Sequence, residues 1–506
     1  MLKKGSTGLN LISSIGFFVL NICVSFWFTP FVISQVGVEA YGFVPLTINI
    51  INYVALFTIV FNSMVARYIT IELKRENIKK ANIYFNTSFV VSSSFAIICF
   101  PIFLYLFFNI ERILHVPSHL QNTVAILFLM TGLNFLINTI KTPFSTSTVY
   151  ANRFDLSNGI SIAELIIRVG SMVVLFYIFG PSLAQIGISY IITAFVSFIL
   201  VMILSNRLMP KIKLNLKYFR IETFKELTKS GIWNSINQLG TILLTQIDLL
   251  LSNILLGATQ AGHYAIALQF PNVIRSLNST ITFVFLPTMI HFYAKDDING
   301  LMKYSKQSVS IVGIVMALPI GLLIGFGDKL LGLWLGSEFS SLYLLVILLS
   351  VQMIVGLPMT VLGNIFIVTN TLRVPAIITC IFGLVNLLLA YILGKTSLGI
   401  YGIAIAGGII LILKNFFFIP MYAAYQLGYK WWHFYKTIIK AIITSIVVIV
   451  CSLVLKYTLY WDSWFGIILC IGISLTITST FIITCILSFE EKKQFQEIFK
   501  RLRTIK

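Results

Sequence analysis

Six charged side chains lie within predicted apolar helices of this chain. They are Arg67, Glu164, Arg168, Asp248, Arg275 and Lys414. A charge in the hydrocarbon of a membrane costs about 2.5–3.5 kcal/mol on insertion scales, so each is expected to face a partner or a water-filled cavity rather than lipid. Fixed cations in such a cavity can replace part of the hydration that an anion loses. The residue types therefore indicate anion binding inside a membrane.

Several of these charges also have a structural interpretation. Glu164 and Arg168 are four residues apart on one predicted helix, a spacing at which they can pair with each other. Arg67 lies at the end of its predicted helix, where its side chain can extend to the interface. Lys414 and Arg275 lie far from the ends of their helices, which favours a position in a cavity.

A polar stripe runs along the apolar segment 232–256. Its members recur at steps of three and four residues, which places them on one face of a helix. They are Asn234, Gln238, Thr241, Thr245, Asp248 and Ser252. The next apolar segment, 262–291, carries Gln269, Asn272 and Arg275 at similar spacing. The two segments are therefore expected to form one wall of a polar cavity.

Asp248 has two interpretations that the sequence leaves open. An isolated carboxylate in a cavity can bind a proton or a sodium ion and couple its gradient to transport. The same carboxylate can instead form a salt bridge with Arg275 of the next helix and hold the two helices together. Glu164 is the second candidate for ion coupling, provided that Arg168 does not pair with it.

The charges are set in a chain that consists almost entirely of candidate membrane spans. Of its 506 residues, 58% are hydrophobic and 10% are charged, against about 25% charged in soluble proteins. A spanning helix needs about 20 mostly apolar residues. The sequence therefore predicts an all-α polytopic membrane protein with about fourteen spans, at residues 9–35, 43–69, 82–110, 121–140, 158–180, 181–204, 232–256, 262–291, 302–325, 342–368, 375–393, 400–425, 437–459 and 463–487.

The basic residues behind the net charge of +19 are unevenly distributed between alternate loops, which indicates the topology of the chain. Placing alternate loops on opposite sides puts 28 Lys and Arg residues on one side and four on the other: Arg112, Lys329, Lys395 and Lys456. The positive-inside rule then predicts that both termini are cytoplasmic. The basic balance is thus explained by orientation in a membrane, and no nucleic-acid partner is expected.

The order of loops repeats once along the chain. Short turns at 36–43 and 256–264 are followed by charged cytoplasmic turns at 70–82 and 294–306. Since each copy has an even number of helices, the copies are expected to be parallel repeats. We predict six-helix lobes at 1–204 and 232–425, a cytoplasmic amphipathic connector at 205–231, a terminal helix pair at 426–489 and a basic cytoplasmic tail at 490–506.

This pattern resembles the polysaccharide or O-antigen flippases of the multidrug/oligosaccharidyl-lipid/polysaccharide exporter superfamily. The resemblance covers the whole chain and includes the turn from Gly37 to Gly42, Asp248 in the seventh helix, Pro287 near the end of the eighth, and the run Gly-Ile-Tyr-Gly-Ile-Ala-Ile-Ala at 399–406. It implies a V-shaped bundle in the bacterial cytoplasmic membrane. The bundle would move a polyprenyl-pyrophosphate-linked oligosaccharide between leaflets, with the bilayer and the polysaccharide polymerase machinery as partners.

On this resemblance, the cations would bind the pyrophosphate, because the arginine fork bonds two phosphate oxygens at once. The candidates for this role are Arg275, Lys414, Arg168 and Arg67. The amides and hydroxyls of Asn234, Gln238, Thr241 and Asn272 would bind sugars. Trp27, Trp233 and Tyr264 are candidates for stacking on sugars, although aromatic residues at helix ends are also common interface anchors.

Other functions remain as alternatives. A flippase of the peptidoglycan precursor shares the fourteen-helix plan. A cation-coupled multidrug exporter usually has twelve helices, and an excess of basic residues would repel cationic drugs. A membrane polymerase, ligase or glycosyltransferase would need larger outer loops than 111–120 and 327–341. The sequence has no phosphate-binding loop and no metal-ligand spacing, so we expect no catalytic residue, metal or cofactor. Coupling to a proton or sodium gradient stays open together with the role of Asp248.

Overall fold

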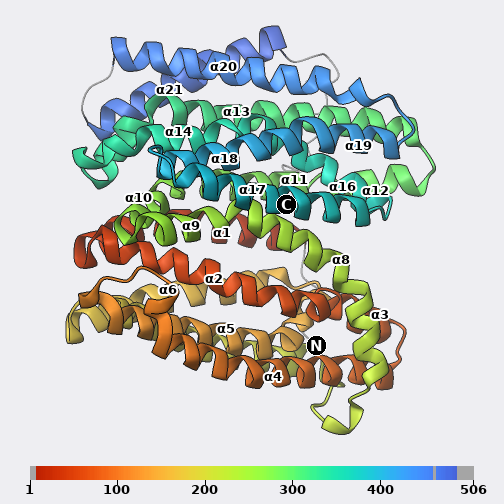
Figure 1. Ribbon diagram of the computed structural model, residues 1–506. Helices are drawn as coiled ribbons and strands as arrows, with labels where there is room; N and C mark the ends of the chain where they lie inside the picture. The colour runs from red at the N-terminus through yellow and green to blue at the C-terminus, as the bar shows by residue number, and fades with distance from the viewer. Residues whose placement is uncertain (1–6, 460–462, 487–506) are drawn as a thin grey trace. The chain divides into compact units, whose positions relative to one another are not determined.

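The computed structural model describes residues 7–459 and 463–486, and every regular element in that part is helical (Figure 1). Thirteen helices are long and apolar enough to cross a membrane, or up to fourteen when the bent pair 231–256 counts as one span. The predicted class, an all-α polytopic membrane protein with about fourteen spans, is confirmed. The predicted tail at 490–506 lies outside the described residues.

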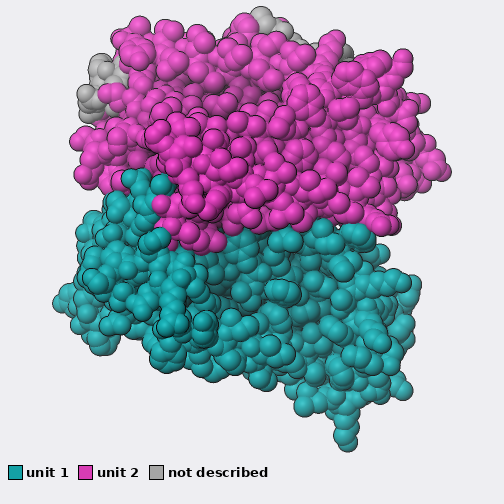
Figure 2. All heavy atoms as spheres, in the orientation of Figure 1, with its two compact units in different colours: residues 1–242, 256–262 teal, residues 243–255, 263–506 magenta. Residues whose placement is uncertain are grey.

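The chain divides into two compact units, which Figure 2 shows in different colours. Unit 1 comprises residues 1–242 and 256–262, and unit 2 comprises residues 243–255 and 263–506. The helices that begin in unit 1 are α1 Thr7–Val36, α2 Val38–Asn62, α3 Val65–Lys74, α4 Ile78–Asn109, α5 Gln121–Tyr150, α6 Phe154–Phe179, α7 Leu183–Leu208, α8 Ile221–Thr245 and α10 Ala258–Ala267.

Unit 2 contains the remaining helices and a short π-helix. They are α9 Ile247–Leu256, α11 Gln269–Phe283, α12 Leu286–Ala294, α13 Ile298–Leu335, α14 Tyr343–Val351, α15 Met353–Met359, α16 Gly363–Val368, α17 Arg373–Gly394, α18 Ile400–Leu413, the π-helix Lys414–Phe418, α19 Ile419–Gln426, α20 Tyr435–Thr458 and α21 Trp464–Phe481. A second π-helix, Ile482–Ile486, follows α21.

Several predicted helix boundaries are wrong, because apolar composition does not mark where helices end. Helix α5 continues ten residues beyond the predicted 121–140 span, and α13 extends to Leu335. The predicted spans 43–69, 232–256, 262–291 and 342–368 are each broken. Pro287 lies at the start of α12 and accounts for the break there, since proline cannot donate the backbone hydrogen bond of a continuous helix.

The loop between α7 and α8 is fixed to α4 by two buried asparagines. The side chain of Asn82 donates to the carbonyl of Lys211 at 3.2 Å and accepts from the amide of Lys213 at 2.8 Å. Asn86 donates to the carbonyl of Lys213 at 2.9 Å and accepts from the amide of Asn215 at 2.7 Å. The two side chains thus take the place of a neighbouring β-strand for this loop, which we call the clipped loop (residues 211–215).

The predicted connector 205–231 is not a separate amphipathic segment, because residues from Ile221 onward form the first turns of α8. Leu227 is buried in unit 1, and the Phe224 ring lies 6.5 Å from the ring of Phe61. Instead, the exposed apolar side chains of the connector are those of Leu214, Leu216 and Ile221.

Helices α13 and α20 pack closely in unit 2 (Figure 1). Three glycines of α13 make this approach possible, because a Cβ at each would overlap a side chain of α20. A Cβ added at Gly313 would lie 2.6 Å from the side chain of Ala441. One added at Gly321 would lie 2.6 Å from Val448, and one at Gly325 would lie 2.3 Å from Ser452. We call this contact the glycine seam. Near one end of this seam, Lys456 forms an ion pair with Asp328 at 2.7 Å.

Candidate functional site

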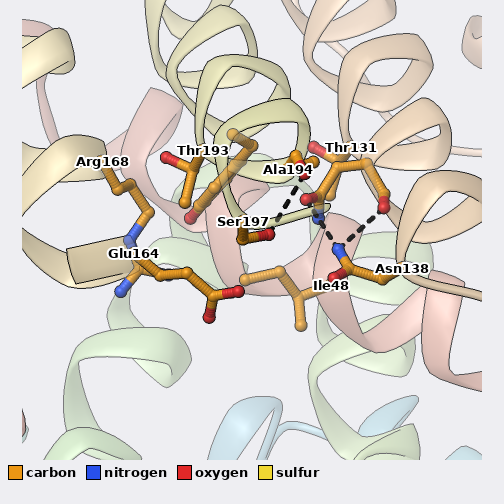
Figure 3. A pocket seen from close by; sticks show the side chains of 10 residues that line it. Ile48, Thr131, Asn138, Glu164, Arg168, Thr193, Ala194 and Ser197 are labelled. Atoms are coloured by element: carbon orange, nitrogen blue, oxygen red, sulfur yellow. Dashed lines mark hydrogen bonds between the residues drawn. The ribbon is translucent and has the colours of Figure 1, made fainter. Parts of the chain in front are cut away.

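A polar pocket of about 260 Å³ lies within unit 1, where α5, α6 and α7 meet beside Ile48 of α2 (Figure 3). Glu164 and Arg168 extend into it from α6. The remaining lining residues are mostly amides and hydroxyls: Thr131, Asn134, Asn138, Tyr190, Thr193, Ala194 and Ser197. Unit 1 also buries polar side chains elsewhere, including Asn82 and Asn86, but here such side chains line a cavity. We call it the unit 1 pocket.

Lys141 neutralises the carboxylate of Glu164 at the edge of this pocket. Its ammonium group lies 2.8 Å from Oε1 of Glu164 and donates to the hydroxyl of Ser197 at 3.0 Å. The pairing of Glu164 with Arg168, one of the two interpretations open from the sequence, is not formed, and Lys141 takes that place. Sequence reasoning missed Lys141 because the helix was expected to end at residue 140. The residue type Asn152 was the sequence signal that could have shown the true boundary, because asparagine is common in the left-handed conformation just after a helix, and its φ is 54° here.

Arg168 extends over the face of a buried tyrosine. Its guanidinium carbon lies 5.6 Å from the centroid of the Tyr190 ring, a distance typical of a cation–π contact. Within the described chain, no carboxylate or carbonyl accepts a hydrogen bond from this guanidinium. Asn138 donates to the carbonyl of Asn134 at 2.8 Å and to its side-chain oxygen at 3.0 Å, which fixes both amides. Because the Arg168 guanidinium has no such acceptor in the described chain, its N–H donors remain available to a ligand.

Asp248 lies inside unit 2, with only 6% of the residue exposed. Its carboxylate accepts from the hydroxyl of Tyr264 at 3.2 Å and from the side-chain amide of Asn386 at 3.3 Å. Asn386 also donates to the carbonyl of Leu243 at 3.0 Å. The buried Oδ1 of Asn386 has no hydrogen-bond partner among the described residues.

The salt bridge between Asp248 and Arg275, one of the two interpretations open from the sequence, is not formed. Arg275 instead donates to the side-chain oxygen of Asn272 at 3.3 Å, on its own helix. Both charged residues line a narrow cavity of about 10 Å³, which is close to the minimum that holds one water molecule. A Cβ at Gly407 would lie 3.0 Å from Oδ2 of Asp248, so the glycine leaves room beside the carboxylate.

Tyr264 and Lys414 are in environments that the sequence did not show. Tyr264 is fully buried and bonded to Asp248, so it is not available to stack on a sugar. Lys414 begins the π-helix of residues 414–418, a type of element that is frequent at functional sites. Its ammonium group forms no hydrogen bond or ion pair with any residue that the structure describes.

The predicted polar stripe is divided between two helices. Asn234, Gln238 and Thr241 belong to α8, whereas Asp248 lies on α9 after a bend of 44°. The segment is therefore not one straight face. Arg67 lies on α3 with an exposed side chain, which suits a position at the membrane interface.

No group of three or more metal-binding side chains occurs in the described residues. The site features are instead a pocket with an available guanidinium in unit 1 and a buried carboxylate in unit 2. The pocket is lined by helices of spanning length, and Asp248 lies on α9, the second half of the bent pair 231–256 that together counts as one span. Such sites suit binding and ion uptake during transport.

Comparison with solved structures shows that the fold is shared with known membrane proteins. The chain is similar to the lipid II flippase MurJ in its inward closed conformation, with a TM-score of 0.69, 17% identity and coverage of 94% of this chain and 97% of that one. It is also similar to an inward-facing multidrug resistance MATE family transporter of the MOP superfamily, with a TM-score of 0.56, 13% identity and coverage of 85% and 96%.

Comparison of sequences defines the family. The family model described as "Polysaccharide biosynthesis protein" matches residues 36–343. The chain is 33% identical to the uncharacterized membrane protein EpsK of Bacillus subtilis (strain 168) over 499 residues, which cover 98% of each chain. The chain belongs to this polysaccharide biosynthesis family of multi-pass membrane proteins, and the resemblance found in the sequence is confirmed.

Proposed function

We propose that the protein is a flippase, which moves a polyprenyl-pyrophosphate-linked oligosaccharide from the inner to the outer leaflet of the bacterial cytoplasmic membrane by alternating access. Since the chain belongs to a polysaccharide biosynthesis family, one structural observation supports this proposal. Arg168, Arg275 and Lys414 lie in spanning helices, and none forms an ion pair within the described chain. Unpaired cations in a membrane are costly, and an anionic substrate that crosses the membrane would compensate for that cost.

Arg275 and Lys414 are our candidates for the pyrophosphate, with Arg67 as an additional contact near the interface. Arginine can bond two phosphate oxygens at once, and lysine adds a point charge. Asn234, Gln238 and Thr241 of α8 are proposed to hydrogen-bond sugars, as is Asn272 of α11. The substrate would be an O-antigen, capsule or exopolysaccharide repeat unit, delivered to polymerase machinery on the outer side.

Asp248 is our candidate for ion coupling, through a proton or a sodium ion. The orphaned Oδ1 of Asn386 and the space left by Gly407 both support a cation beside this carboxylate. Glu164 no longer serves as a second candidate, because Lys141 already neutralises it.

A cation that binds only the folded protein raises its melting temperature. We therefore expect sodium, but not potassium, to raise the melting temperature if sodium is the coupling ion, and Asp248→Asn to abolish this rise.

Transport of a lipid-linked peptidoglycan precursor is the second candidate. The likeness to the lipid II flippase MurJ supports it, at the level of fold alone. The two functions differ in the intermediate that would accumulate when the protein is lost. If the protein were a multidrug exporter, its loss would cause neither intermediate to accumulate.

The test is deletion of the gene in its host, followed by analysis of polyprenyl-linked intermediates and surface glycan. We expect a complete oligosaccharide repeat to build up on its carrier while surface glycan falls. Accumulation of the peptidoglycan precursor would favour the second candidate. Normal or truncated intermediates would overturn the flippase proposal.

Complementation with variants then tests the cations. Arg275→Ala and Lys414→Ala should lose surface glycan by about tenfold or more, the loss typical of one charge-assisted contact. Arg275→Lys should keep part of the activity. Arg112→Ala, an exposed arginine outside the proposed site, is the control and should complement fully. Normal surface glycan with Arg275→Ala would remove this residue from the site.

A further inference from the structure

The unit 1 pocket has the size of a site for one small polar ligand. Its volume of about 260 Å³ lies below the range of about 300–1,000 Å³ that holds drug-sized molecules. A whole oligosaccharide repeat does not fit in it. One sugar ring, or a small anion with its water, is the appropriate size.

The charges around this pocket leave one net positive charge. Glu164 and Lys141 form a close pair and cancel each other. Arg168 is then the only uncompensated charge among the described residues that line the pocket or contact its edge. A ligand with one negative charge would therefore neutralise the pocket. A pyrophosphate, with at least two negative charges, would leave an excess of negative charge beside Glu164.

The remaining groups are of the kind that bind sugar hydroxyls. The Asn138 amide is engaged through its nitrogen, which leaves its Oδ1 as an acceptor toward the pocket. The side-chain nitrogen of Asn134 has no acceptor among the described residues. The hydroxyl of Tyr190 is likewise without a described partner, although the residue is only 9% exposed. The guanidinium plane of Arg168, held against the Tyr190 ring, is suited to bond both oxygens of a carboxylate.

We propose that the unit 1 pocket binds a single carboxylate-bearing sugar, so that the transported glycan contains a uronate or a similar acidic residue. This inference rests on the proposed flippase function and specifies its substrate class. Arg168 is the residue that would bond the carboxylate. Asn134, Asn138 and Tyr190 would bond the ring hydroxyls, and the Lys141–Glu164 pair would hold α5 and α6 at the correct spacing.

The direct test is binding of free monosaccharides to the purified full chain in nanodiscs, measured by saturation-transfer difference NMR with titration. Two matched pairs of probes are used: glucuronate with glucose, and galacturonate with galactose. The members of each pair differ only in the carboxylate. We expect at least one uronate to bind about tenfold or more tightly than its neutral partner. Inorganic phosphate should not displace it at equal concentration.

Variants locate the effect. Arg168→Gln should abolish the preference for the uronate, whereas Arg168→Lys should retain part of it because the charge remains. Arg207→Gln changes an exposed arginine at the end of α7 and should behave as the unchanged protein. Size-exclusion profiles and melting temperatures of the three variants check that the fold is retained.

Three results would overturn the proposal: equal binding of uronate and neutral sugar, tighter binding of phosphate than of either uronate, or no saturable binding of either uronate. These failures are distinguishable from failure of the flippase function. If gene deletion causes the oligosaccharide intermediate to accumulate but no uronate binds, only the acidic-sugar site is rejected. If a uronate binds but no intermediate accumulates, the site stands and the transport proposal is rejected.

Discussion

At the scale of single residues, the Lys141–Glu164 contact decides how the charges in unit 1 are distributed. The pair is only partly screened by solvent, since 14% of the lysine side chain and 32% of the glutamate side chain are exposed. Removal of one partner leaves a charge with poor hydration in a spanning helix. Removal of both avoids this penalty, because no uncompensated charge remains.

We therefore expect Lys141→Ala to destabilise the protein by about 1–3 kcal/mol, below the cost of breaking a fully buried pair. The double variant Lys141→Ala with Glu164→Gln should recover much of the loss. Melting temperatures in detergent for the four members of this double-mutant cycle provide the measurement. Additive effects of the two substitutions would show that the pair contributes no coupling energy.

At the scale of elements, the clipped loop between α7 and α8 has a fixed path because of side chains from α4. Asn82 and Asn86 are both buried, and each makes one donating and one accepting contact with the loop backbone. Each hydrogen bond contributes about 0.5–1.5 kcal/mol net. The basic side chains of the loop are therefore presented on an ordered backbone.

Asn86→Ala should release this loop without changing the spanning helices. Trypsin should then cut after Lys211 and Lys213 several-fold faster in the purified protein, because the open state of the loop is more populated. Cut sites and rates are measured by mass spectrometry over time. Asn109→Ala, at the opposite end of α4, serves as the matched control and should leave the rate unchanged. An unchanged rate for Asn86→Ala would mean that the asparagine contacts do not hold the loop.

The glycine seam makes a second prediction at this scale. In Gly325→Ala the new methyl group would overlap Ser452, and overpacking of this kind typically costs about 1–3 kcal/mol. In Gly472→Ala of α21 the methyl group meets nothing within 4 Å, so helix propensity should leave it neutral or up to about 1 kcal/mol more stable. Opposite shifts of the melting temperature are the expected result. A fall for both variants would show that the seam is not the cause.

At the scale of the whole molecule, the charge asymmetry of the loops predicts the orientation of every span. A cysteine placed at Lys217 should be cytoplasmic, and one placed at Lys395 should be external. Both positions are exposed. In a variant without native cysteines, a membrane-impermeant maleimide should label the Lys395→Cys protein in intact cells, and the Lys217→Cys protein only after permeabilisation. The reverse pattern would invert the proposed topology.

The number and type of the spans could be predicted from the sequence because apolar runs of sufficient length have few other solutions in a membrane. The ends of α5 and α13 could not, since both helices continue past charged residues that composition assigns to loops: Lys141 in α5, and Asp328 and Lys329 in α13. The partner of Glu164 was missed for this reason. The contact of Asp248 with Asn386 could not be predicted either, because it joins helices far apart in the sequence.

The hydrogen bonds from Asn82 and Asn86 to the clipped loop all join main-chain atoms of the loop. Any residue other than proline at positions 213 and 215 can provide the same amides and carbonyls. Evolution is therefore expected to treat the two partners differently: Asn82 and Asn86 should persist among relatives while the side chains at 211–215 diverge. Such a loop can acquire new surface chemistry for a new host without any change in the helices that hold it.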